Sequence, residues 1–75
     1  MPRIFETIFD ANDVMVSRQV LGAFFLDRVT AASFLDVHLP SAFPNGKTGY
    51  DCDGDYWWGC SLHADTMIHH YTIEE

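Results

Sequence analysis

The first hydrophobic pattern of the chain, residues 3–9, fits two periodicities. Its sequence Arg-Ile-Phe-Glu-Thr-Ile-Phe is rich in β-branched and aromatic residues, which is typical of a strand. The repeats Ile4/Ile8 and Phe5/Phe9 at i,i+4 also suit helical turns. We favour a strand or an irregular start, and residues 10–13, rich in helix-capping types, interrupt the pattern.

Apolar residues then recur at helical spacing from Val14 to Leu39. One stripe consists of Leu21, Phe25, Arg28, Ala32, Leu35 and Leu39. Phe24 and Val29 lie beside this stripe and widen it. Thr30 could cap a second helix, so the region is either one long helix or two helices that break near Thr30. Pro40 is expected to end it, because a residue that precedes proline avoids the helical conformation.

The remaining chain is predicted to be a loop followed by strands. Residues 40–49 contain the turn sequence Pro44-Asn45-Gly46. Asp53-Gly54 signals a hairpin turn, residues 56–62 suit a strand, and residues 63–65 are expected to turn the chain. From residue 66 to 73 the pattern alternates, with Met67, His69, Tyr71 and Ile73 on one face.

These elements predict one domain of the α+β class. Residues 1–75 would form a single domain, with a helical part at about 10–39, a loop at 40–49 and an acidic, aromatic β part at 50–75. One or two N-terminal helices would pack on a small C-terminal antiparallel sheet, each burying one face. A chain of this length buries only about 60% of its unfolded surface, so a homodimer would add stability.

Charge divides the chain into two unequal parts. The net charge is −7, and no Lys or Arg follows Lys47. Residues 1–47 hold five acids and four bases, whereas residues 48–75 hold six acids and no base. Direct binding to nucleic acid is disfavoured, because neutralising phosphates requires clustered Lys and Arg. The balance favours basic partners instead, including proteins that themselves bind nucleic acid.

The compartment expected from the sequence is the cytoplasm. The N-terminus lacks a charged segment followed by an apolar one, and acidic residues come early. The longest apolar run, residues 20–26, is far too short to span a bilayer. In the cytoplasm Cys52 and Cys60 would be free thiols, and a disulfide across a hairpin is the alternative.

The run Asp51-Cys52-Asp53-Gly54-Asp55 invites comparison with a calcium loop. Carboxylates at loop positions 1, 3 and 5 converge on the ion in an EF-hand. The match fails at position 6, which is Tyr56 rather than Gly, and at position 12, which is Leu62 rather than Glu. An acidic hairpin tip that faces water is therefore the favoured interpretation.

Zinc binding or thiol chemistry has weaker support. The candidates are Cys52, Cys60, His63, His69 and His70, but their spacing matches no common zinc motif. His69 and His70 are adjacent, so on a strand they point to opposite faces. No signature of nucleophilic catalysis is present, and we expect neither an enzyme nor a cofactor. A small metal-binding or redox domain that uses this cluster and the three aspartates is kept as the second hypothesis.

Aromatic residues and carboxylates together indicate a binding surface. Trp57 and Trp58 would point to opposite faces of a strand, so one can enter the core while the other contacts a partner. Carboxylates two residues apart on a strand lie about 6.5–7 Å apart, close to the phosphate spacing of a nucleic-acid strand. The candidate partner-binding residues are Asp51, Asp53, Asp55, Trp57, Trp58, Asp65, Glu74 and Glu75.

In its small size, acidity and lack of enzyme motifs, the chain resembles the phage-encoded inhibitors of host defence of the anti-CRISPR type. The segment from Tyr50 to Trp58 carries this resemblance, which is one of type and not of an aligned motif. The resemblance implies stoichiometric binding to a basic channel of a CRISPR effector or a related nuclease, and so block of its nucleic-acid site.

Overall fold

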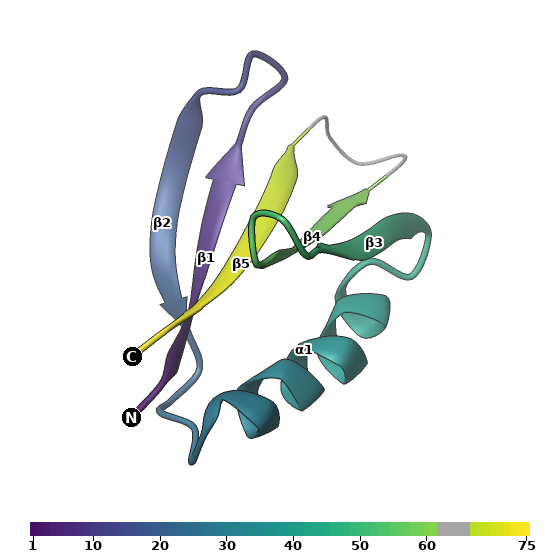
Figure 1. The fold of residues 1–75 in the computed structure, drawn as a ribbon. Coiled ribbons are helices and arrows are strands. Elements are labelled where there is room, and N and C mark those ends of the chain that lie inside the picture. Colours follow the sequence, from purple (N-terminus) through teal and green to yellow (C-terminus); the bar gives the residue numbers. More distant parts are fainter. Residues whose placement is uncertain (62–66) are drawn as a thin grey trace.

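The protein is a five-stranded sheet with one helix. The computed structural model describes residues 1–61 and 67–75, and Figure 1 shows their arrangement. The elements, in chain order, are β1 (Arg3–Phe9), β2 (Met15–Leu21), α1 (Arg28–Ala42), β3 (Gly46–Asp51), β4 (Tyr56–Ser61) and β5 (Ile68–Glu74).

All strand pairs are antiparallel, and the spatial order is β2-β1-β5-β4-β3. The β1–β2 hairpin forms one side of the sheet and the meander of β3, β4 and β5 forms the other. The helix connects the two edge strands, β2 and β3. The two parts join where β1 pairs with β5 along seven residues, from Arg3 opposite Glu74 to Phe9 opposite Ile68.

The segment from Asp10 to Val14 is a tight turn. The Asp10 carboxylate accepts hydrogen bonds from the backbone amides of Asn12 at 2.8 Å and Val14 at 3.0 Å. Asp13 adopts φ 61°, the left-handed conformation that Asp and Asn tolerate better than most residues. The turn therefore begins a hairpin and not a helix.

The expected helical part at 10–39 is wrong in its first half. Met15–Leu21 is β2, which pairs antiparallel with β1 from Leu21 opposite Ile4 to Met15 opposite Phe9. Gly22 then adopts φ 77°, which a right-handed helix does not contain. Of the predicted stripe, Arg28, Ala32, Leu35 and Leu39 lie in the helix, and only Leu35 and Leu39 of these are buried. Its extension to Val14 mistook strand residues for helix.

The helix begins at a side-chain cap and not at Thr30. Asp27 is the N-cap, and its Oδ1 accepts hydrogen bonds from the amide and the hydroxyl of Thr30, both at 2.8 Å. The hydrogen bond from the Thr30 amide lowers the pKa of the Asp27 carboxyl. Pro40 lies inside the helix, which ends at Ala42. Pro40 lies in the last turn, so its missing N–H costs a single bond close to the helix end.

One core lies between α1 and the sheet. Ala31, Leu35 and Leu39 recur at i,i+4 along α1 and are buried, with Leu35 fully inaccessible. They face the sheet side that carries the other buried apolar residues, Ile4, Trp57, Tyr71 and Ile73. The alternation expected for residues 67–73 is confirmed at Tyr71 and Ile73. Figure 1 shows α1 on one side of the sheet, and no other described element covers the opposite side.

The expected architecture of N-terminal helices on a C-terminal sheet is wrong. The chain has one helix, placed between β2 and β3, and the described residues are mostly sheet. Strands from both halves of the chain form that sheet, so the N-terminal half is not a helical layer. The strand at residues 3–9 and the hairpin at Asp53-Gly54 are confirmed. The loop at 40–49 is shorter than expected, because β3 begins at Gly46; the turn at 63–65 lies outside the described residues.

Replacing Leu35 by Ala tests the core assignment. Leu35→Ala removes a fully buried side chain, so the free energy of unfolding should fall by about 2–5 kcal/mol. Val37→Ala, on the same helix but 77% exposed, is the matched control and should change it by about 0.5 kcal/mol or less. Urea unfolding followed by circular dichroism measures both. Equal effects of the two substitutions would show that α1 is oriented differently.

Candidate functional site

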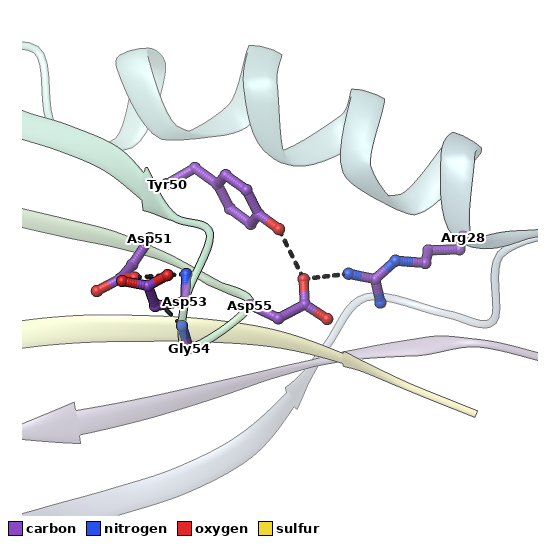
Figure 2. Close-up of polar contacts among 6 residues, drawn as sticks. All are labelled: Arg28, Tyr50, Asp51, Asp53, Gly54 and Asp55. Carbon is purple, nitrogen blue, oxygen red and sulfur yellow. Dashed lines mark hydrogen bonds and ion pairs between the residues drawn. The ribbon is translucent and has the colours of Figure 1, made fainter.

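Three of the predicted partner-binding residues lie in the acidic hairpin between β3 and β4. Asp51 ends β3, and residues 52–55 form the turn. The Asp51 Oδ1 atom accepts hydrogen bonds from the backbone amides of Asp53 at 3.0 Å and Gly54 at 3.2 Å. Figure 2 shows this carboxylate directed into its own turn. Asp51 therefore holds the turn in shape, as Asx turns do.

Asp55 connects the hairpin to the helix. It adopts φ 53°, and its Oδ1 accepts a hydrogen bond from the Tyr50 hydroxyl at 2.8 Å. The same carboxylate forms an ion pair with Arg28, the first residue of α1. Figure 2 shows Tyr50 and Arg28 converging on this group from the strand and from the helix. The hydrogen bond to Asp55 raises the pKa of the Tyr50 hydroxyl.

The three aspartates therefore do not form a row of equivalent charges. The expected hairpin tip is present, with Asp53 and Asp55 in the turn, but each of the three carboxylates has a different environment. Asp51 caps the turn and Asp55 pairs with Arg28. Among the described residues, the Asp53 carboxylate has no hydrogen-bond or ion-pair partner, so it is the one directed only to solvent.

The two tryptophans take opposite faces, as their positions in a strand require. Trp57 is 8% exposed and belongs to the core, where the centre of its ring lies 4.5 Å from the centre of the Tyr50 ring. Trp58 is half-buried on the other side of the sheet, opposite Gly49. A Cβ at Gly49 would lie 2.7 Å from the Trp58 indole, so the ring lies flat across that glycine. Trp57 is therefore unavailable to a partner, whereas Trp58 remains accessible in part.

The carboxylates near the end of the chain are also unequal. Glu74 forms an ion pair with Arg18 at 2.5 Å and accepts a hydrogen bond from the Thr72 hydroxyl at 3.0 Å. Glu75 is exposed. Asp65 lies outside the described residues, so its relation to the hairpin stays a prediction.

The metal or redox hypothesis gains no support from the arrangement. No group of three His, Cys, Asp or Glu residues able to hold a metal ion occurs within residues 1–61 and 67–75. Cys52 lies in the hairpin turn and Cys60 in β4, and both are free thiols, as the compartment argument predicted. His69 and His70 point to opposite faces, and His63 lies outside the described residues.

A polar cluster around Glu6 was missed by the sequence analysis. Glu6 lies on the core face of β1 and is 9% exposed. Its carboxylate accepts hydrogen bonds from the Tyr71 hydroxyl at 2.6 Å and the Gln19 amide at 2.8 Å, and lies 3.3 Å from His69 Nδ1. The period-two pattern of β1 could have shown it, because Glu6 shares a face with Ile4 and Ile8.

The Glu6 cluster stabilises the fold and shows no substrate site. Burial raises the pKa of the Glu6 carboxyl, but the hydrogen bonds from Tyr71, Gln19 and His69 outweigh it, so the pKa lies below its ordinary value. Burial and the bond to Glu6 raise the pKa of Tyr71 far above its usual range, so it stays a hydrogen-bond donor. The described residues form no pocket in which these groups could meet a substrate.

Comparison of this chain with protein families, with curated proteins and with solved structures finds no match. In the part of the chain that the structure describes, no helix is both long and apolar enough to cross a membrane.

The Glu6 cluster predicts how stability depends on pH. Because the folded pKa is depressed, the stabilisation is complete above the unfolded pKa of about 4.3 and is lost as the pH falls through the folded value. Glu6→Gln should therefore flatten the decline of the free energy of unfolding below about pH 4.5. Urea unfolding between acidic and neutral pH measures this decline.

Tyr71→Phe is the companion variant, because it keeps the ring and removes the hydroxyl that lowers the pKa of Glu6. It should flatten the same part of the profile. An unchanged acid decline in both variants would show that Glu6 is not held as an ionised carboxylate in this cluster.

Proposed function

We propose that the protein is an acidic interaction protein that binds a basic, nucleic-acid-binding surface of another protein and blocks it stoichiometrically. The observation that carries the proposal is the unbalanced charge of the second part of the chain. Residues 48–75 hold six carboxylates and no base, within a chain of net charge −7. Such a field attracts Lys/Arg arrays and speeds their encounter.

Two arginines of residues 1–47 each form an ion pair with a carboxylate of residues 48–75 and neutralise it. Arg18 pairs with Glu74 and Arg28 pairs with Asp55. Asp51, Asp53 and Glu75 have no Arg or Lys partner within residues 1–61 and 67–75. The hydrogen bonds that Asp51 accepts come from neutral amides and leave its charge in place. A negative surplus therefore remains at the hairpin and at the end of β5.

The two acidic segments lie at the same end of the sheet. β4 and β5 are antiparallel, with Trp57 opposite Tyr71, so the hairpin that precedes β4 lies beside the last residues of β5. We call this end, where Asp51, Asp53 and Glu75 keep an uncompensated charge, the acidic end. Surfaces that bind nucleic acid concentrate Lys and Arg, which are the groups this end would neutralise. Among such partners, the CRISPR effectors suggested by the resemblance of type are the first class to test.

The direct test uses target-DNA binding by purified CRISPR surveillance complexes. Binding is followed by gel shift with increasing amounts of this protein at low and at high salt. Loss of the DNA complex near equimolar protein, and its return as salt screens the contact, is the expected result. Failure to displace DNA from any complex of the panel at low salt would reject a CRISPR effector as the partner.

Charge reversal at the hairpin tip locates the contact. Asp53→Lys should weaken inhibition by about tenfold or more, since it places a like charge against a basic surface. The fold should persist, because the turn uses the backbone amide of Asp53 and not its side chain. Asp36→Lys, on the exposed side of α1, changes the net charge by the same two units and is the matched control. Equal losses in the two variants would mean that only net charge matters and that the acidic end is not the contact.

A further inference from the structure

The connection between β2 and α1 holds two large apolar side chains in water. We call residues 22–26, with the sequence Gly-Ala-Phe-Phe-Leu, the apolar loop. Phe24 is 58% exposed and Leu26 is 78% exposed, and Val29 in the first turn of α1 is exposed beside them. Single exposed apolar residues need no explanation, but neighbouring ones in one short segment mark a contact surface.

The backbone of the apolar loop is held in place by the residue between the two exposed ones. Phe25 packs against the core, and the centre of its ring lies 5.3 Å from the centre of the Phe34 ring. The Phe25 amide donates a hydrogen bond to the carbonyl of Pro2, a buried residue, at 2.9 Å. Because the loop is already ordered on both sides of its exposed side chains, a contact here costs less conformational entropy than one made by a free segment.

The apolar loop lies at the same end of the sheet as the acidic end. Leu21, which precedes the loop, ends β2 beside the first residues of β1, and Arg3 of β1 lies opposite Glu74 of β5. After the loop, Arg28 forms the ion pair with Asp55 of the hairpin. Figure 1 shows this connection at the end of the sheet where both termini lie. The loop is therefore adjacent to both acidic segments, the hairpin and the end of β5.

Charge around the apolar loop is negative. Among the described residues, Arg3 is the one base at this end outside an ion pair, and its guanidinium lies 5.0 Å from the centre of the Phe24 ring. Against this single base stand the exposed carboxylates of Asp27, Asp53 and Glu75. A surface of this kind repels acidic partners and suits a basic one, which would bring Lys or Arg to the carboxylates around the loop.

We propose that the apolar loop anchors the contact made by the acidic end, through Phe24 and Leu26, and that the partner surface presents an apolar side chain among its Lys and Arg residues. This inference rests on the proposed function and adds the apolar part of the interface to it. Protein interfaces combine an apolar centre with a polar rim. The carboxylates speed the encounter with a basic surface, and the apolar contact slows dissociation.

The other apolar candidates are less exposed or lie further from the carboxylates. The sequence analysis expected a tryptophan of β4 to contact the partner, but Trp57 is buried and Trp58 lies flat across Gly49. Val37 is as exposed as Leu26, but it lies about 13 Å further along α1 than Arg28. The apolar loop is therefore the exposed apolar segment that a partner of the acidic end would meet.

A peptide titration of the intact protein, followed by heteronuclear NMR at low salt, tests the proposal. Two peptides with the same number of arginines are compared, one with tryptophan and the other with serine between the arginines. Both should shift the amide signals of residues 52–55. Only the tryptophan peptide should also shift those of residues 22–26, and its dissociation constant should be lower by about fivefold or more.

The two proposals fail in different ways in this titration. Equal affinities for the two peptides, with no shift at residues 22–26, would overturn the role of the apolar loop and leave the proposed function standing. Binding of neither peptide at low salt would show that the acidic end does not attract a basic surface, and so would overturn both.

Leu26→Ser should bring the affinity for the tryptophan peptide close to that for the serine peptide. Val37→Ser is the matched control, equally exposed, and should bind both peptides as the wild type does. Urea unfolding verifies that both variants are folded. Equal losses in the two variants would overturn the proposal. Shifts of residues 22–26 that follow the protein's own concentration, without peptide, would also overturn it and would assign the loop to a contact with a second copy.

Discussion

The pairing of β1 with β5 is the contact on which the rest of the structure depends. It joins the N-terminal hairpin to the C-terminal meander along seven residue pairs. Without it the protein would consist of a two-stranded hairpin and a three-stranded meander, and α1 would have no continuous surface to cover. Glu6 and Tyr71 face each other within this pair, and their 2.6 Å hydrogen bond satisfies a buried carboxylate at the join. A buried acid is tolerated there because each of its partners comes from the sheet itself.

Local signals in the sequence were sufficient for some elements and insufficient for others. The strand Arg3–Phe9, the Asp53-Gly54 hairpin and the alternation of the last strand follow from turn chemistry and period two. β2 was misread as helix, since its apolar residues continue smoothly into a helical stripe that starts further on. The decisive information was the positive φ of Asp13 and Gly22, which the residue types permit but do not dictate. The pairing of β1 with β5 is a long-range choice that no local pattern encodes.

For the predicted site residues too, local sequence patterns were not sufficient. That Trp57 and Trp58 point to opposite faces follows from the pleat, but which of them enters the core depends on where α1 lies. The aspartates were expected to form a hairpin tip that faces water, but the fold also uses Asp51 as a turn cap and Asp55 as a link to Arg28. The first use leaves the charge of Asp51 in place, since neutral donors do not cancel a charge, whereas Arg28 neutralises Asp55. A carboxylate can therefore serve the fold and still contribute to attraction at a distance.

The join between β1 and β5 also governs the order in which the chain folds. About 65 residues separate the paired segments, so closing this contact costs more loop entropy than forming either hairpin. Of the four strand pairs it is the distant one, so it is expected to form after the hairpins. During synthesis β1 and β2 are made before α1 and β5. Until those elements are made, both faces of the β1–β2 hairpin are uncovered. The nascent protein thus passes through a period in which an apolar hairpin is accessible to chaperones or to other unfinished chains.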